Sequence, residues 1–117
     1  MDAETIISNQ LAAYNAKDLD LFMSFWAKDA QIYSFPDTEI CSGHSAIRER
    51  HKIRFQEPDL HAALLHRLVL DDMVIDQEQV RRNLDTGIHK VPVIAIYQVK
   101  AHLIQRATFK MGQAEPV

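Results

Sequence analysis

The sequence predicts an α+β domain in which helices cover one face of a single antiparallel sheet, and two observations carry this prediction. The first half of the chain contains three segments with the apolar spacing of helices and one short strand pattern. The second half contains four runs rich in β-branched and aromatic residues, separated by the turn sequences DD, DTG and KAH. Helices that precede a run of antiparallel strands are typical of this class.

Each helical segment has its own start or stop signal. Asp2 is expected to cap a first amphipathic helix, and Asp18 a second helix that ends near Ala27. A third helix is expected to open at Gly43 and to end before Pro58, because a proline disfavours the helical conformation of the residue that precedes it. Between the second and third helices, residues 29–35 alternate as a strand does.

The size and composition indicate one domain. A chain of 117 residues with 47% hydrophobic residues can build a core without disulfides or metals. We expect the domain to span residues 1–112 and residues 113–117 to form a flexible tail. There are no internal repeats and no low-complexity segments.

The charge and cysteine content limit the possible partners and the compartment. The net charge of −3 provides no basic field for nucleic acid or for an acidic membrane surface. Cys41 is the single cysteine, and the first residues lack the cationic and apolar regions of a signal peptide, so we expect a cytoplasmic protein. No apolar run approaches the roughly 20 residues that a membrane-spanning helix needs.

Three motifs of the first half resemble a known group of proteins. NAKDLD, FWAKDA and SGHSAIRE are similar to the ketosteroid isomerase and SnoaL-like group of the nuclear transport factor 2-like superfamily. The second half agrees with that group mainly as a pattern of four long strands. The resemblance implies a cone, in which a strongly curved antiparallel sheet wraps around the three helices, with a pocket at the open end and often a homodimer. Enzymes and binding modules share this fold, so the fold alone does not define the function.

The isomerase site does not carry over to this sequence. The resemblance implies a tyrosine and a protonated aspartic acid that hold the enolate oxygen, and an aspartate base. An alignment without gaps places Gln10, Ala95 and Ser34 at those three positions. Alanine cannot donate a hydrogen bond, and a serine without an adjacent base cannot abstract a proton from carbon. Steroid isomerisation by that mechanism is therefore not expected.

Other enzymes of the superfamily suggest two further sets of residues. The resemblance to the dehydratases implies a His and Asp pair, which His61 or His66 could form with Asp18. The alignment turns Leu60, Ala62, Leu64, His66 and Leu68 inward, which selects His66. The resemblance to the epoxide hydrolases implies an Asp, Arg, Asp trio, for which Arg67, Asp76 and Glu78 are the right residue types, although the alternation of the strands is expected to turn all three outward.

The hairpin around Asp71 and Asp72 predicts which of these residues face the pocket. With these two residues as the turn, His66 lies opposite Gln77, Arg67 opposite Asp76 and Leu64 opposite Gln79. Because buried unpaired charge costs more than a buried amide, we expect the face with His66, Gln77 and Gln79 to be the concave one. The Arg67–Asp76 pair is then expected on the convex face, where the two charges neutralise each other.

Two hypotheses for the function follow. The first is an isomerase- or dehydratase-like enzyme that binds a small apolar molecule and uses His66 as the titrating catalytic group. The second is a non-catalytic binding module whose pocket is lined by Tyr14, Phe22, Trp26, Ile32 and Tyr97. No cofactor is expected, and the six histidines lack the spacing of a metal site. The predicted ligand-binding residues are Gln10, Tyr14, Trp26, Ser34, Gln77, Gln79 and Tyr97.

The outward positions of the strands predict self-association. They include apolar residues that a soluble monomer would leave in water, so a homodimer through the convex sheet face is expected. These residues are Ala63, Leu65, Val69, Ile94 and Ile96.

Overall fold

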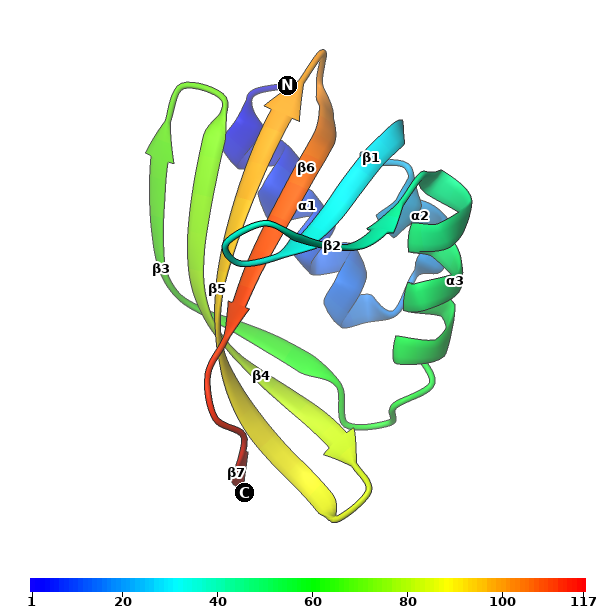
Figure 1. Ribbon diagram of the computed structural model, residues 1–117, viewed down its shortest axis with the longest axis vertical. Coiled ribbons are helices and arrows are strands. Elements are labelled where there is room, and N and C mark those ends of the chain that lie inside the picture. The colour runs from blue at the N-terminus through cyan, green and yellow to red at the C-terminus, as the bar shows by residue number, and fades with distance from the viewer.

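A computed structural model describes all of residues 1–117 and contains three helices and one curved sheet that does not close on itself (Figure 1). The α+β class predicted from the sequence is confirmed. The helices are α1 (Ala3–Ala16), α2 (Leu19–Met23) and α3 (His44–Arg54). The strands are β1 (Trp26–Ser34), β2 (Thr38–Ser42), β3 (His61–Leu70), β4 (Met73–Leu84), β5 (Gly87–Lys100), β6 (Leu103–Met111) and β7 (Glu115–Pro116).

The helix starts follow the sequence signals. The Asp2 carboxylate accepts a hydrogen bond from the Thr5 amide at 2.8 Å and caps α1. Asp18 caps α2 in the same way through the Leu21 amide at 3.2 Å. The second helix is shorter than predicted, because Trp26 pairs with Ile104 of β6 and thus begins β1. None of the three helices has the length and apolar character needed to cross a membrane.

The sheet has the strand order β2-β1-β6-β5-β4-β3. Neighbouring strands are antiparallel except for β1 and β6, which are parallel. The sequence predicts neither this parallel pair nor β2, which forms a hairpin with β1. Residues 113–117, predicted to be a flexible tail, contain β7, which pairs with β5 at His89 and Lys90. The helices lie against the concave side of the curved sheet (Figure 1).

The core lies between the helices and the concave face. Phe22 and Met23 of α2, Ile6 and Ile7 of α1, and Ile47 of α3 are fully or almost fully buried there. On the sheet side they meet the inward residues of the strands. Five of these residues are Ile32, Val74, Ala95, Ile104 and Ala107.

The β3–β4 hairpin has the predicted turn but not the predicted faces. Asp71 and Asp72 form the turn, and His66 pairs with Gln77 and Arg67 with Asp76, as expected. On the side of His66 away from the turn, the register shifts by one residue, because Leu65 is the extra residue of a β-bulge. Leu64 consequently lies opposite Glu78 instead of Gln79.

Between the bulge and the turn, the side chains of β3 point to the opposite face of the sheet from the one that the sequence predicts. Ala62 is buried opposite Val80, in agreement with its predicted inward direction. A regular strand would carry that direction on to His66, whereas the bulge turns Arg67 inward in its place. The prediction that His66, Gln77 and Gln79 line the concave wall is therefore wrong. All three are exposed on the convex side.

The bulge also changes the list of outward apolar residues. Ala63 pairs with Gln79, and Ile94 and Ile96 lie opposite Gln77 and Ile75, so these three residues face outward as predicted. Val69 pairs with the buried Val74 and lies on the inner side, which corrects the prediction for that residue. Leu68, predicted to point inward, is outward and 57% exposed.

Candidate functional site

A cavity lies between the concave face of the sheet and the three helices. The cavity opens to solvent, and most of its wall is apolar. A concave apolar wall with a few polar groups is typical of small-molecule sites. Its wall is made by residues from every helix and from six of the strands: Gln10, Leu11, Tyr14, Phe22, Trp26, Ile32, Ile40, Arg50, His51, Arg54, Ala62, Glu78, Val80, Arg82, Val91, Val93, Tyr97, Phe109 and Met111.

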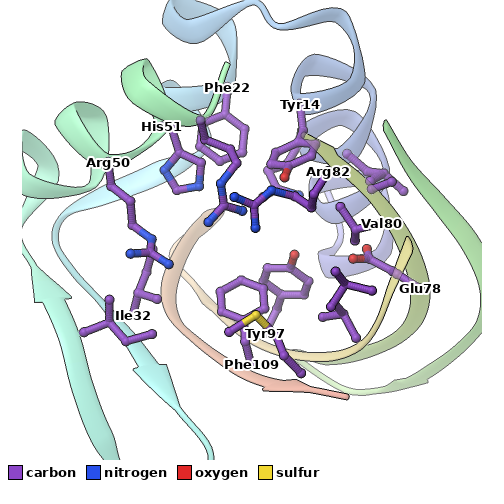
Figure 2. A pocket seen from close by; sticks show the side chains of 18 of the residues that line it. Tyr14, Phe22, Ile32, Arg50, His51, Glu78, Val80, Arg82, Tyr97 and Phe109 are labelled. Atoms are coloured by element: carbon purple, nitrogen blue, oxygen red, sulfur yellow. The ribbon is translucent and has the colours of Figure 1, made fainter. Parts of the chain in front are cut away.

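Glu78 of β4 is the one carboxyl group on the wall of this cavity. Its side chain is only 5% exposed and points toward the open space (Figure 2). Burial raises the pKa of Glu78 from its ordinary value of 4.5 to about 7, and the negative charge of Asp76 contributes to the increase. The pKa near 7 means that both protonation states are populated in neutral solution, as a general acid or base requires.

The Arg67–Asp76 pair lies next to Glu78 on the same face of the sheet, since Asp76 is two residues before Glu78 on β4. Arg67 Nε and Nη2 donate hydrogen bonds of 2.7 and 2.9 Å to the two carboxylate oxygens of Asp76, which is completely buried. Ser8 of α1 accepts a further hydrogen bond from Arg67. This bidentate pair neutralises Asp76 within the wall, and neither partner lines the cavity. The prediction of an outer-face pair is thus wrong in its location and correct in its partners.

Two tyrosines bring hydroxyl groups to the cavity. Tyr97 of β5 is buried, and burial keeps its pKa well above 10, so its hydroxyl remains a hydrogen-bond donor. Gln10 lies beside that hydroxyl. Burial also raises the pKa of Tyr14 of α1. Figure 2 shows the oxygen atoms of Tyr14, Tyr97 and Glu78 directed into the same space.

His51 of α3 is a neutral imidazole on the opposite wall. Its Nδ1 lies 2.8 Å from the carbonyl oxygen of Ile47, so Nδ1 donates and Nε2 carries the free electron pair. Burial lowers the pKa of His51 from 6.5 to about 4, and the nearby cations Arg54 and Arg50 add to this effect. His51 is therefore a hydrogen-bond acceptor in the cavity at neutral pH. The ring packs 4.5 Å from the ring of Phe22.

Three arginines complete the wall, and only two of them lie beside a carboxylate that can neutralise their charge. Arg82 of β4 donates hydrogen bonds of 2.8 Å from Nε and Nη2 to the carboxylate of Glu57. Arg54 of α3 lies 3.7 Å from the same carboxylate. Arg50, one turn earlier on α3, makes no ion pair, because the four ion pairs of the chain use Arg48, Arg54, Arg67 and Arg82.

The predicted site residues divide into two groups. Gln10, Tyr14, Trp26 and Tyr97 lie on the cavity wall, where their role as ligand-binding residues stays a prediction. His66, Gln77, Gln79 and Ser34 lie outside the cavity wall. All five residues of the predicted apolar lining are part of the wall: Tyr14, Phe22, Trp26, Ile32 and Tyr97.

The structure places the two residue sets suggested by other enzymes of the superfamily in different positions relative to the cavity. Asp18 is exposed and serves as the cap of α2, and His61 is also exposed, so neither contributes to the cavity. Arg67, Asp76 and Glu78 do gather on the inner face, but only Glu78 reaches the open space. No three His, Cys, Asp or Glu side chains are grouped in a way that could hold a metal ion.

The sequence patterns do not single out Glu78, His51 or the cavity-lining arginines as site residues. The spacing of Ile47, His51 and Phe55 places His51 on the apolar stripe of α3, which is a usable signal. Arg50 and Arg54 are four residues apart, and this spacing puts them on one face of the helix, although a solvated face is the commoner interpretation of such a pattern. For Glu78, the signals are the resemblance to the epoxide hydrolases, which makes it a candidate beside Arg67 and Asp76, and its shared parity with Val74 and Val80.

The curved sheet, the three helices on its concave side and the open cavity between them define the cone fold of the nuclear transport factor 2-like superfamily. The chain belongs to the SnoaL-like domain family, whose model matches residues 7–107. Among curated proteins, none matches the chain.

Solved structures show the same fold at low sequence identity. An uncharacterized cystatin fold protein from Novosphingobium aromaticivorans is 24% identical, with a TM-score of 0.86 over 93% of this chain and 97% of that chain. An NTF2-like protein of unknown function from Cytophaga hutchinsonii is 7% identical, with a TM-score of 0.79 over 96% and 91% of the two chains. A hypothetical protein from Catenulispora acidiphila with a ketosteroid isomerase-like fold, in complex with trimethylamine, is 12% identical, with a TM-score of 0.75 over 89% and 82%. These likenesses support the fold.

Proposed function

We propose that the protein is an isomerase- or dehydratase-like enzyme that acts on a small, largely apolar carbonyl compound, with Glu78 as the general acid and base. The observation that carries this proposal is the position of Glu78, a buried carboxyl group on the wall of an apolar cavity with a pKa of about 7. Glu78 takes the role that the sequence suggests for His66. Perturbed carboxyl groups of this kind are characteristic of catalytic sites.

The surrounding groups support a proton transfer at carbon. The Glu78 carboxylate would remove a proton from the carbon next to the carbonyl group. The electron pair of that C–H bond would form a C=C bond to the carbonyl carbon, and the π pair of the carbonyl group would move to its oxygen. The Tyr97 hydroxyl would donate a hydrogen bond to the resulting enolate oxygen. The protonated Glu78 would then return the proton to another carbon in an isomerisation, or to a departing hydroxyl group in a dehydration.

Exchange of carbon-bound protons with D2O tests this chemistry without knowledge of the natural substrate. A panel of cyclic ketones and enones would be incubated with the protein in D2O, and the loss of α-proton signals would be followed by NMR. We expect exchange that depends on the protein and that falls about 100-fold or more in Glu78→Gln. The rate for the wild-type protein should rise as the pH increases through about 7, where Glu78 becomes a carboxylate.

His66→Ala is the control, because it removes the convex-face histidine without touching the cavity. This variant should keep the wild-type exchange rate. Equal rates in wild type and Glu78→Gln would contradict the proposal. Loss of exchange in His66→Ala alone would instead restore the role that the sequence suggests for that histidine.

A non-catalytic binding module is the second candidate. The observation in its favour is that Glu78 is the single carboxyl group on a wall made mainly of apolar and aromatic side chains, together with the amide of Gln10, the neutral imidazole of His51 and three arginines. Trp26 is the only tryptophan and lies on this wall, so its fluorescence should respond to a ligand. Ketones that bind by this measure and never exchange their protons would favour the binding module over the enzyme.

A further inference from the structure

We infer that the molecule bound in the cavity is an organic acid whose carboxylate pairs with Arg50 while its apolar body lies against the aromatic wall. This inference deepens the proposed function and rests on it, because it concerns the ligand of the same cavity. It begins with an imbalance of charge. The wall contains three guanidinium groups and one carboxyl group, although the chain as a whole has a net charge of −3.

Two of the three arginines already have an anionic partner. Glu57 accepts hydrogen bonds from Arg82 Nε and Nη2, and its second neighbour is Arg54, whose Nε lies 3.7 Å away. The backbone N–H of Asn83 also donates a hydrogen bond to the Glu57 carboxylate, at 2.9 Å. The acceptor capacity of the Glu57 carboxylate is therefore used by these groups.

Arg50 has neither an ion pair nor a side-chain hydrogen bond in the folded chain. It is half-buried on α3, and burial together with the neighbouring Arg54 charge lowers its pKa. An unpaired guanidinium that is partly removed from water is costly, and a bound anion would offset this cost. The planar guanidinium group matches a carboxylate, which it can bind through two parallel hydrogen bonds.

The positions of Arg50 and Glu78 define the orientation of the acid. Figure 2 shows Arg50 extending from α3 on the side of Ile32, whereas Glu78 projects from β4 on the other side of the open space. A carboxylate at Arg50 would place the apolar part of the molecule between Phe22, Tyr97 and Phe109. The far end of the molecule would then lie beside the Glu78 carboxyl group, where the proposed proton transfer takes place.

A matched pair of ligands tests the inference. Cyclohexanecarboxylate and cyclohexanecarboxamide have nearly the same shape and differ in charge. Their binding to the full chain would be measured by calorimetry and by Trp26 fluorescence. We expect the wild-type protein to bind the carboxylate about tenfold or more tightly than the amide, as a charge-assisted hydrogen bond of a partly buried guanidinium allows. The preference should weaken as the salt concentration rises.

Variants of α3 assign the preference to one residue. Arg50→Gln should bind the two ligands equally well, and Arg50→Lys should keep part of the preference because it keeps the charge. Lys52→Gln is the matched control, because Lys52 is an exposed cation on the same helix. This variant should behave as the wild type does. Circular dichroism and thermal unfolding of each variant would establish that it is folded.

Three results would overturn the inference: equal affinity of the wild type for the two ligands, no binding of the carboxylate at millimolar concentration, or a preference that survives in Arg50→Gln. The test is independent of the proposed catalysis. Glu78→Gln should keep the carboxylate preference, so a preference without proton exchange would refute the enzyme and leave the acid site intact. Exchange of neutral ketones without any preference for the carboxylate would support the enzyme and refute the acid site.

Discussion

At the scale of the residue, two buried titratable side chains face the same cavity and affect stability in opposite ways. The pKa of Glu78 is raised to about 7 in the folded protein, so the native state keeps a proton that the unfolded chain releases above pH 4.5. Stability should therefore decrease as the pH rises from about 4.5 to 7. The pKa of His51 is lowered to about 4, so its contribution to stability is lost as the pH falls from 6.5 to about 4.

Substitution of Glu78 should make the protein more stable above pH 7. Glu78→Gln removes the cost of a buried carboxylate, and a pKa shift from 4.5 to about 7 corresponds to a gain of up to about 3 kcal/mol in the free energy of unfolding. At pH 4 the gain should vanish, because Glu78 is then protonated in both states. Urea unfolding between pH 4 and pH 8 measures the difference. A stabilisation that is the same at both ends of this range would mean that the charge of Glu78 is not its source.

Substitution of His51 should have the complementary effect. Without an imidazole that takes up a proton on unfolding, His51→Asn should lose the fall in stability between pH 6.5 and about 4. The variant should also be less stable than the wild type at pH 7, because the ring of His51 packs against Phe22 and Phe55. The same urea series measures the slope and the offset separately. An unchanged slope would contradict the neutral state of His51.

The residue scale also shows what alternation in a sequence can predict. Alternation and the resemblance to the superfamily place Ala62, Tyr97 and Ile32 on the inner face, and the structure has them there. The cost of a buried unpaired charge predicts Arg67 and Asp76 on the outside. The two hydrogen bonds between them remove that cost, because each charge is buried with its partner. How well the two groups fit together depends on the folded backbone, which no pattern of residue types describes.

At the scale of the element, the β3–β4 hairpin decides which side chains reach the cavity. The turn at Asp71 and Asp72 and the pairs next to it follow from the sequence. The bulge at Leu65 does not, because no glycine or proline marks it. The sheet must curve strongly around the helices, and a bulge bends the strand that contains it. One extra residue is therefore the physical reason that Glu78, and not the predicted His66, faces the cavity.

The buried ion pair of this hairpin should be sensitive to the loss of either partner. Asp76→Asn leaves Arg67 charged without a carboxylate, and the expected loss is about 3–5 kcal/mol in the free energy of unfolding. The same substitution should lower the pKa of Glu78, because the negative charge of Asp76 helps to raise it. Urea unfolding gives the first quantity, and NMR titration of the Glu78 carboxyl carbon gives the second.

The double variant Arg67→Met/Asp76→Leu separates the pair from the packing around it. Because it leaves no unpaired charge, it should be more stable than Asp76→Asn alone. Additive losses from the two positions would show that the two side chains do not act as a pair.

At the scale of the whole molecule, the cavity occupies the concave side and an apolar strip occupies the convex side. Leu68, Ile75 and Ile96 are neighbours across three strands, since Leu68 pairs with Ile75 and Ile75 with Ile96. Leu68 is 57% exposed, and Leu70 next to it along the same face is 71% exposed. Compared with the predicted outward residues, the bulge removes Val69 from this face and adds Leu68, Leu70 and Ile75.

This strip leads to our last prediction, which concerns assembly. A row of apolar side chains on an open sheet face is unfavourable in water, and a second copy of the chain offers a complementary row. We expect a homodimer in solution, and Ile96→Glu at the centre of the strip should convert it to a monomer, because two buried carboxylates would face each other across a two-fold axis. Lys28→Glu is the control, because Lys28 is exposed on β1 away from this strip. Light scattering measures the mass of each variant. A monomeric mass for the wild-type chain would contradict the prediction, and so would a dimeric mass for Ile96→Glu. Because the strip and the cavity lie on opposite faces of the sheet, the monomeric variant should keep its preference for cyclohexanecarboxylate.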